Sequence, residues 1–283
     1  MDRDTNLISS REGRIAALQK LNLLSNTFMS VALQDEETCQ YVLRILMGIE
    51  DLVVREVRTQ YTISKITSRG AVLDVLATDS NGKIYNIEIQ KRSTLDHGRR
   101  TRFYHSMIDS ELLQKGKDYN ELPDVHIIYI SETDLWRAGR TTYSVKKFFE
   151  GTDTIYEDGV TILYVNAAID DGTEIAGMMK YFKEADPEDA SQGMLSKRVH
   201  FLKCEEGGHD TMCEVMEQFI ELGREEGLEI GREQGLEQGI LNLVDAFREV
   251  GISDLIILQK IQDKFKLTRE EAETYLKKQE NSL

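Results

Sequence analysis

The chain has 283 residues, with 35 basic and 50 acidic side chains, a formal net charge of −15 and a hydrophobic fraction of 40%. That length allows one large domain or two modest ones, and the hydrophobic fraction is enough for a core. Taken alone, the acidity argues against a nucleic-acid-binding protein, and no apolar run approaches the roughly 18 residues needed to cross a bilayer. The polar first residues, MDRDTNLISSREGR, predict no signal peptide.

The cysteines indicate the redox environment. Cys39, Cys204 and Cys213 are scattered and odd in number. They form no ligand-spaced pair, so the sequence predicts reduced thiols in a cytoplasm and not disulfides. A zinc site made from Cys204, His209 and Cys213 is disfavoured, because three scattered candidates lack the spacing of a zinc motif.

The N-terminal part is expected to be helical, and the first strand follows it. Residues 1–20 are expected to form a leader or a first helix, and apolar residues recur at helical spacing through residues 21–33. A further helix is predicted over residues 36–48, with Gly48 as its C-cap. β-branched residues then predict a strand over residues 52–58.

Residues 71–90, AVLDVLATDSNGKIYNIEIQ, predict a β-hairpin. Apolar and polar side chains alternate in both halves, which is the pattern of strands with one face in a core. A three-residue loop at residues 80–82, whose glycine adopts the left-handed conformation, is a common hairpin connection. That loop sets a register in which Asp74 lies directly opposite Glu88.

The facing carboxylates of Asp74 and Glu88 indicate a metal site. Opposed residues on one face have Cβ atoms about 4.5–5.5 Å apart, and two carboxylates at that distance repel each other unless a cation lies between them. A hard divalent cation such as Mg²⁺ takes oxygen ligands, and Gln90 lies on the same face two residues further on. The prediction depends on the register, because a two- or four-residue loop would place the two acids on opposite faces.

A basic cluster directly follows the hairpin. Five basic residues and one acid lie between positions 91 and 102, and the basic ones are Lys91, Arg92, Arg99, Arg100 and Arg102. The cluster overlaps a helix predicted over residues 96–116, and it weakens the objection that the net charge raises against nucleic acid. Strands are predicted over residues 125–131 and 161–166, followed by a short helix over residues 173–182.

The C-terminal part is acidic and repetitive. From residue 205 to residue 240 there are eleven acidic and two basic side chains, and glycine recurs at every fourth position, as Gly223, Gly227, Gly231, Gly235 and Gly239. Each glycine costs a helix about 0.8–1 kcal/mol, so either close packing on another helix compensates or the segment is flexible. Residues 241–278 are expected to form two or three short helices, and Thr268 with Glu271 matches a capping box.

The order of elements and three segments resemble a known nuclease superfamily. The segments are LDVLATDSNGKIYNIEIQ, RRTRFYHSMIDSELLQKGKDY and VHIIYI. Over about residues 21–149 the chain is similar to the PD-(D/E)xK nuclease superfamily, and within it to the Rpn-type recombination-promoting nucleases, a transposase-like branch. The resemblance implies an α/β fold with a restriction-endonuclease-like core, a mixed sheet flanked by helices, and a helical C-terminal region.

The expected domain organisation has four parts. They are an N-terminal leader over residues 1–20, a nuclease-like domain over residues 21–185, an acidic helical segment with the glycine repeat over residues 186–240, and a small helical region over residues 241–283. The segment EADPEDA indicates the limit near residue 185, because it contains four acids and one of the two prolines of the chain.

The same resemblance implies a DNA endonuclease that uses Mg²⁺ or Mn²⁺. Asp74, Glu88 and Gln90 would be its catalytic residues, and Asp74 and Glu88 its metal ligands. A further ligand from the first helix is often part of such sites, and Glu37 is the best match for it, with Glu36 next. The chain departs from the superfamily pattern twice. The proline before the aspartate is absent, and Gln90 stands in place of lysine, so it can orient water by hydrogen bonds but carries no charge.

Arg99, Arg100 and Arg102 are expected to neutralise DNA backbone phosphates, which makes binding dependent on salt. The structural alternatives are a solvated hairpin face for the two acids, and an exposed helix face with ion pairs for the arginines. The leading hypothesis is a cytoplasmic, metal-dependent DNA endonuclease that self-associates through its glycine-repeat helix. The alternatives are a degenerate nuclease fold that only binds a protein or nucleic acid, and a regulatory core whose tail assembles oligomers.

Overall fold

The computed structural model describes residues 10–64, 70–91 and 96–280. The chain divides into two compact units, Met1–Met216 and Glu217–Leu283, and the division falls within the helix α8, Glu206–Glu249. This division reflects how compactly the residues pack, whereas the limits expected at residues 20, 185 and 240 were based on sequence composition. Those expected limits therefore stay a prediction.

The first unit contains a six-stranded mixed sheet with the order β1-β2-β3-β4-β6-β5. Its strands are β1 Val54–Ile63, β2 Ala71–Asp79, β3 Ile84–Gln90, β4 Val125–Ser131, β5 Thr142–Val145 and β6 Val160–Asn166. Strands β1, β2 and β3 are antiparallel neighbours, β3, β4 and β6 run parallel, and β5 pairs antiparallel with β6 at the edge. The expected mixed sheet is confirmed, with β5 as a strand that the sequence analysis did not assign.

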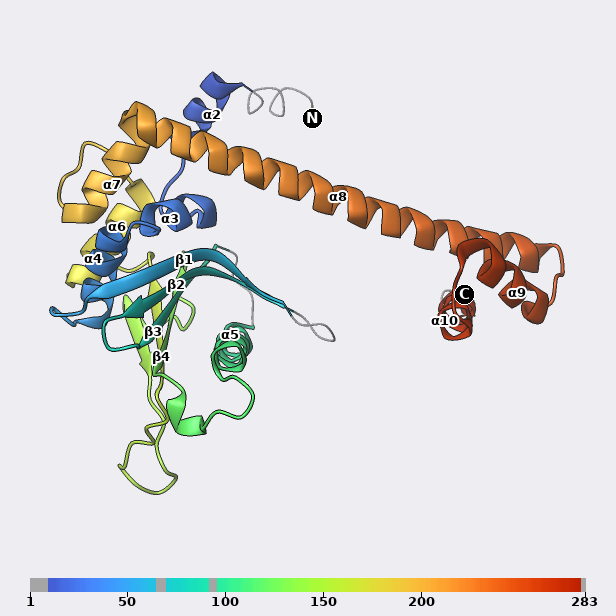
Figure 1. Cartoon of the computed structure of the whole chain (residues 1–283), viewed down its shortest axis with the longest axis horizontal. Coiled ribbons are helices and arrows are strands. Elements are labelled where there is room, and N and C mark those ends of the chain that lie inside the picture. The colour runs from blue at the N-terminus through green and yellow to red at the C-terminus, as the bar shows by residue number, and fades with distance from the viewer. Residues whose placement is uncertain (1–9, 65–69, 92–95, 281–283) are drawn as a thin grey trace. The chain divides into compact units, whose positions relative to one another are not determined.

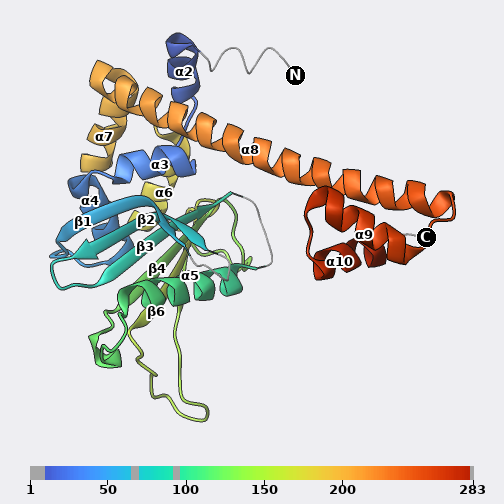
Figure 2. The same cartoon turned by 45° about the vertical axis from the view of Figure 1, so that its right-hand side comes forward.

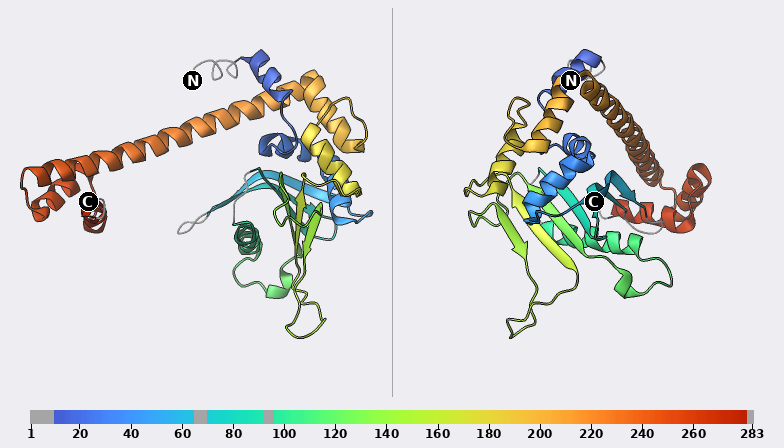
Figure 3. Two further views of the ribbon diagram at one scale, coloured as in Figure 1. Left: turned by 180° about the vertical axis from the view of Figure 1, so that it is seen from behind. Right: turned by 60° about the vertical axis from the view of Figure 1, so that its left-hand side comes forward.

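Helices cover both sides of this sheet. Four of them lie on one side, namely α3 Asn26–Leu33, α4 Glu36–Met47, α6 Glu174–Glu184 and α7 Gly193–Cys204, and α5 His97–Leu112 lies on the other (Figure 1). The view in Figure 2 shows α5 running along the face opposite α3 and α4, and the rear view in Figure 3 shows the same separation. The remaining short elements of the unit are α2 Arg11–Leu18 and the 3₁₀ turn Tyr119–Glu121. Of the expected leader, residues 1–9 lie outside the described residues.

The alternation in β3 decides which side chains meet which helices. Tyr85, Ile87 and Ile89 are buried in the large core with Phe28 of α3 and Phe182 of α6. The even positions face α5, where Ile84 packs in a second, smaller core with Met107 and Ile108. Glu88 and Gln90 are also at even positions of the strand, so their side chains point toward the α5 side, beyond the end of that small core.

The hairpin between β2 and β3 has the register predicted from its loop. Pairs run from Thr78 opposite Ile84 to Val75 opposite Ile87. The Asp79 N–H donates to the Lys83 carbonyl over 3.0 Å, and Gly82 has a φ of +80°. The paired register ends at Val75 and Ile87, one residue short of Asp74 and Glu88.

Alanine at Gly82 is expected to destabilise the first unit by about 1–2 kcal/mol, because a non-glycine residue must adopt left-handed backbone there. Gly177 in α6 is a matched control, because an added Cβ meets nothing within 4 Å at either position and Gly177 has no positive φ. Gly177→Ala is expected to stabilise by about 0.5–1 kcal/mol. Denaturant unfolding of both variants checks this, and equal effects of the same sign would contradict the assigned turn.

The second unit is helical. The C-terminal part of α8 packs with α9 Asp254–Phe265 and α10 Arg269–Glu280 around a small core of Ile240, Val244, Ile257, Ile261, Ala272 and Leu276. The capping box before α10 is confirmed, since the Thr268 N–H donates to the Glu271 carboxylate over 2.8 Å and the Glu271 N–H donates to Thr268 Oγ1 over 3.3 Å. Within the described part of the chain, no helix has both the length and the apolar character to cross a membrane.

Candidate active site

Asp74 and Glu88 lie where β2 and β3 separate. Past the Val75–Ile87 pair, the Ile89 N–H donates to Asp74 Oδ2 over 3.0 Å, and the Asp74 N–H donates to Glu88 Oε1 over 3.2 Å. Each carboxylate thus takes a backbone donor of the opposite strand. The two residues are only 6% and 4% exposed, so the structure excludes a solvated hairpin face for this pair.

Three polar side chains from α3 and β1 hold Asp74 in place. Asn26 Nδ2 and Gln60 Nε2 donate to Asp74 Oδ1 over 3.2 and 3.4 Å, and Ser30 Oγ donates to the Asp74 carbonyl over 3.3 Å. Gln60 adopts a φ of +50° within β1. A non-glycine residue in this region stores strain, and such strain collects at functional sites.

Burial sets the electrostatics of the pair. It raises the pKa of Asp74, against the hydrogen bonds from Ile89, Gln60 and Asn26. The pKa of Glu88 is raised well above its ordinary value, first by burial and then by the negative charge of Asp74. The positive charge of Arg100 opposes both shifts. Two adjacent carboxylates in a low-dielectric site fit a hard divalent cation, which takes oxygen ligands and neutralises their repulsion.

Arg100 of α5 meets Gln90 at the end of β3. Its Nη1 lies 3.4 Å from Gln90 Oε1 and 3.5 Å from the Tyr104 hydroxyl. Burial raises the pKa of Tyr104 to about 12, and the next cause is the charge of Glu88, which places this hydroxyl near the carboxylate pair. Beside Arg100 a pocket of ≈ 360 Å³ opens, whose lining includes Ala71, Asp96, Arg99, Phe103 and Tyr104.

The structure brings some predicted site residues together and leaves others apart. Asp74, Glu88, Gln90 and Arg100 form one continuous set through the contacts above. Arg99 and Arg102 are exposed on α5, and Arg92 lies outside the described residues. Glu37 is exposed in the first turn of α4 and, within the described chain, does not group with Asp74 and Glu88 within 4.8 Å.

The sequence analysis missed Asn26 and Gln60. They contact Asp74 from 48 and 14 positions away, across an element boundary. A single sequence carries no signal for such pairs, because nothing local distinguishes a buried amide that serves a carboxylate from an exposed one.

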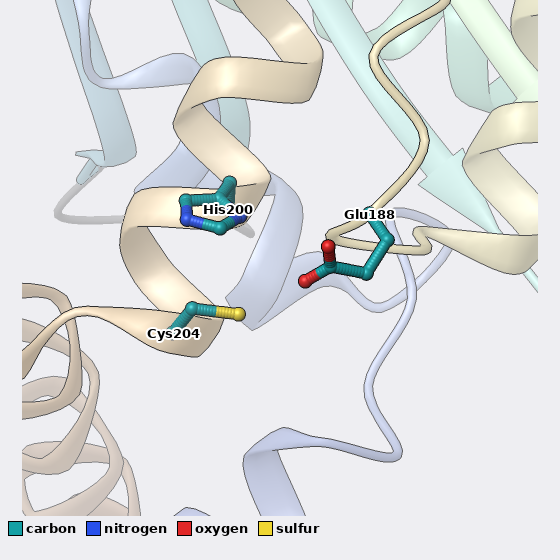
Figure 4. Close-up of side chains that lie close together, drawn as sticks. All are labelled: Glu188, His200 and Cys204. Carbon is teal, nitrogen blue, oxygen red and sulfur yellow. The ribbon is translucent and has the colours of Figure 1, made fainter.

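Glu188, His200 and Cys204 lie together away from this site (Figure 4). They form the one group of three ligating side chains within 4.8 Å that the described residues contain. His200 Nδ1 is 3.1 Å from the Pro187 carbonyl oxygen, which only accepts, so that nitrogen carries a proton. Burial and then Glu188 raise the pKa of the Cys204 thiol. The hydrogen bond of His200 fastens the loop before α7 to the helix, and exposed groups of this kind are common without a metal ion.

A family model described as PD-(D/E)XK nuclease family transposase matches residues 40–189. The chain belongs to this family. Both carboxylates, Gln90 and Arg100 lie inside the matched range, whereas Asn26 lies outside it. The resemblance of the sequence to PD-(D/E)xK nucleases is thereby confirmed, and the six-stranded sheet flanked by helices is consistent with the α/β fold of the family. No curated protein and no solved structure matches the chain.

Proposed function

We propose that this protein is a Mg²⁺- or Mn²⁺-dependent DNA endonuclease of the recombination-promoting, transposase-like type. The observation that carries the proposal is the pair of buried carboxylates, Asp74 and Glu88, at the point where β2 and β3 separate. An uncompensated pair of buried acids is costly to a fold. A function that requires a cation explains why both are present.

Asp74 and Glu88 would hold the metal. When bound, a divalent ion neutralises phosphate charge and lowers the pKa of a bound water. In the hydrolysis a water oxygen forms a bond to phosphorus, one P–O ester bond breaks, and the departing oxygen takes a proton. Asn26, Gln60 and the Ile89 N–H fix the Asp74 carboxylate, so its orientation is set before substrate arrives.

DNA is the proposed substrate because the site lies beside a basic helix. Arg99 and Arg102 are exposed on α5 and available for backbone phosphates. Contacts of this kind release counterions, so affinity should fall as the salt concentration rises. A cytoplasmic location is proposed as well, since all three cysteines are free thiols.

A second candidate is a degenerate nuclease fold that only binds a protein or nucleic acid. The observation in its favour is Gln90, which occupies the position of the superfamily's lysine without its charge. Incubation of supercoiled plasmid with the purified protein, with Mg²⁺, Mn²⁺ or a chelator, separates the two candidates. Metal-dependent nicking or linearisation supports the nuclease. Retention of DNA without cleavage in any metal supports the binding module.

The glycine repeat in α8 supports a proposal of self-association. Gly227, Gly231, Gly235 and Gly239 are helical, and a Cβ added at any of them meets nothing within 4 Å, so within the described chain no neighbour occupies the stripe. The double change Gly231→Ala and Gly235→Ala is expected to raise helix stability by about 0.8–1 kcal/mol per site and to weaken a dimer packed on the stripe. Circular dichroism and sedimentation measure the two effects, and an unaltered dimer would exclude packing through these glycines.

A further inference from the structure

The site has a positive charge close to the position where lysine is missing. Arg100 Nη1 lies 3.4 Å from Gln90 Oε1, and Gln90 is the last residue of β3. The Arg100 side chain is 30% exposed, so it is partly withdrawn from water and remains reachable from the pocket beside it.

The other arginines of α5 do not share this environment. Arg99 and Arg102 are exposed. Arg100 and Tyr104 are one helical turn apart and turn toward the sheet together, because residues at i and i+4 occupy one helix face. The ion pair between Arg100 and Asp96 has a separation of 3.6 Å and a half-exposed carboxylate, so water screens it and the guanidinium keeps its capacity to bind an anion.

We propose that Arg100 is the cationic catalytic residue of this site, and that Gln90 and Tyr104 position it. The proposal rests on the proposed nuclease function and assigns Arg100 a role apart from the exposed arginines. Its guanidinium would donate two N–H groups to non-bridging oxygens of the scissile phosphate, a geometry that arginine matches well. Those bonds stabilise the charge that develops as water adds to phosphorus.

In this assignment Gln90 acts on Arg100 and not on water. The Gln90 amide oxygen accepts from Nη1, and the Tyr104 hydroxyl oxygen accepts from the same nitrogen over 3.5 Å. Both are neutral groups, so they orient the guanidinium without cancelling its charge. The pocket lined by Arg99, Phe103 and Tyr104 would admit the phosphate from the α5 side.

The test measures plasmid cleavage by Arg100→Ala, with Lys197→Ala on α7 as the control that also removes one positive charge. Arg100→Ala is expected to lower kcat by about 10²–10³-fold, the usual effect of losing one preorganised donor to a transition-state oxyanion. Mn²⁺ affinity, measured by electron paramagnetic resonance, should be retained, since Arg100 is not a ligand. Lys197→Ala should cleave like the parent, because Lys197 is exposed on α7 and has no part in the proposed site.

Two rescues distinguish a catalytic charge from a structural role. Added guanidinium ion at millimolar concentration should partly restore cleavage by Arg100→Ala and have no effect on a variant lacking Asp74. The double variant Gln90→Lys with Arg100→Ala should recover more activity than Arg100→Ala, because lysine returns a positive charge to the end of β3. The thermal midpoints of all variants are measured alongside.

Each outcome decides the assignment. Cleavage by Arg100→Ala at the parent rate overturns the role of Arg100 and leaves the nuclease proposal standing. A loss of activity in Arg100→Ala that neither rescue restores, with a lowered thermal midpoint, also overturns it in favour of a structural role. Absence of cleavage by the parent protein in every metal overturns the nuclease function and this proposal with it.

Discussion

Replacement of Glu88 with glutamine, or of Asp74 with asparagine, is expected to reduce metal-dependent DNA cleavage by more than about 100-fold, since loss of even an outer-shell partner costs metal sites 10–100-fold. Glutamine keeps the shape of Glu88, and its amide oxygen can still accept from the Asp74 N–H. The fold should therefore persist while one negative charge is lost. Divalent cation affinity, measured by Mn²⁺ titration, should fall in parallel with cleavage.

Glu37→Gln is the matched control for these two changes. Glu37 was the third ligand expected from the resemblance, and it is exposed in the first turn of α4. The variant removes one acid from the same unit, so any effect of net charge on DNA binding appears in all three proteins. Glu37→Gln should cleave like the parent. If the Asp74 and Glu88 variants cleave DNA at the rate of the parent protein, the activity comes from a contaminant or from another centre.

The metal-free protein is expected to lose stability as the pH rises, and Mg²⁺ should restore it. The pKa of Glu88 is raised in the folded state by burial and by Asp74. Above the ordinary value of 4.5 the folded state therefore holds a proton that the unfolded chain has released. This contribution is complete below pH 4.5 and is lost as the pH rises through the folded pKa of Glu88. A bound cation stabilises the ionised form and removes the loss.

Glu88→Gln is expected to stabilise the metal-free protein at pH 8. Its uncharged amide ends the repulsion by Asp74, and a gain of about 1 kcal/mol would raise the melting temperature by about 2–4 °C for a domain of this size. Thermal unfolding of parent and variant from pH 5 to pH 8, with a chelator or with Mg²⁺, checks both effects. Parallel pH profiles for the two proteins in chelator would show that Glu88 does not carry the dependence. Asp74→Asn is a less clean comparison, because both Asp74 oxygens accept hydrogen bonds, so the asparagine NH2 group must face another donor.

The local parts of the site were predictable from the sequence. A three-residue loop with Gly82 fixes the register by itself, and that register brings Asp74 and Glu88 to the point where the two strands separate. Strand β4, Val125–Ser131, and helix α4, Glu36–Met47, were predicted nearly to the residue, because a short apolar run and a capped amphipathic stripe are complete local signals.

The support around the carboxylates was not predictable. Asn26 reaches Asp74 because α3 packs across β1 and β2, a contact between distant elements that no local pattern encodes. The resemblance implied an acidic ligand from a helix, with Glu37 as the best match, whereas the helical side chain that contacts Asp74 is the amide of Asn26. The partial burial of Arg100 depends on how α5 lies on the sheet, and the sequence shows only four arginines in one cluster.

Asp74 and Glu88 each accept a hydrogen bond from the backbone of the opposite strand, and these bonds would make the binding of a cation depend on the backbone geometry. Asp74 Oδ2 serves the Ile89 N–H, and Glu88 Oε1 serves the Asp74 N–H. A cation that draws on the same oxygens must share them with these amides, so its binding free energy depends on how far β2 and β3 have parted. By reciprocity, a ligand that favours one separation of the strands, such as the proposed DNA, would change the affinity for the ion by the same factor by which the ion changes the affinity for that ligand. In the proposed nuclease, these main-chain hydrogen bonds would therefore couple metal binding to DNA binding.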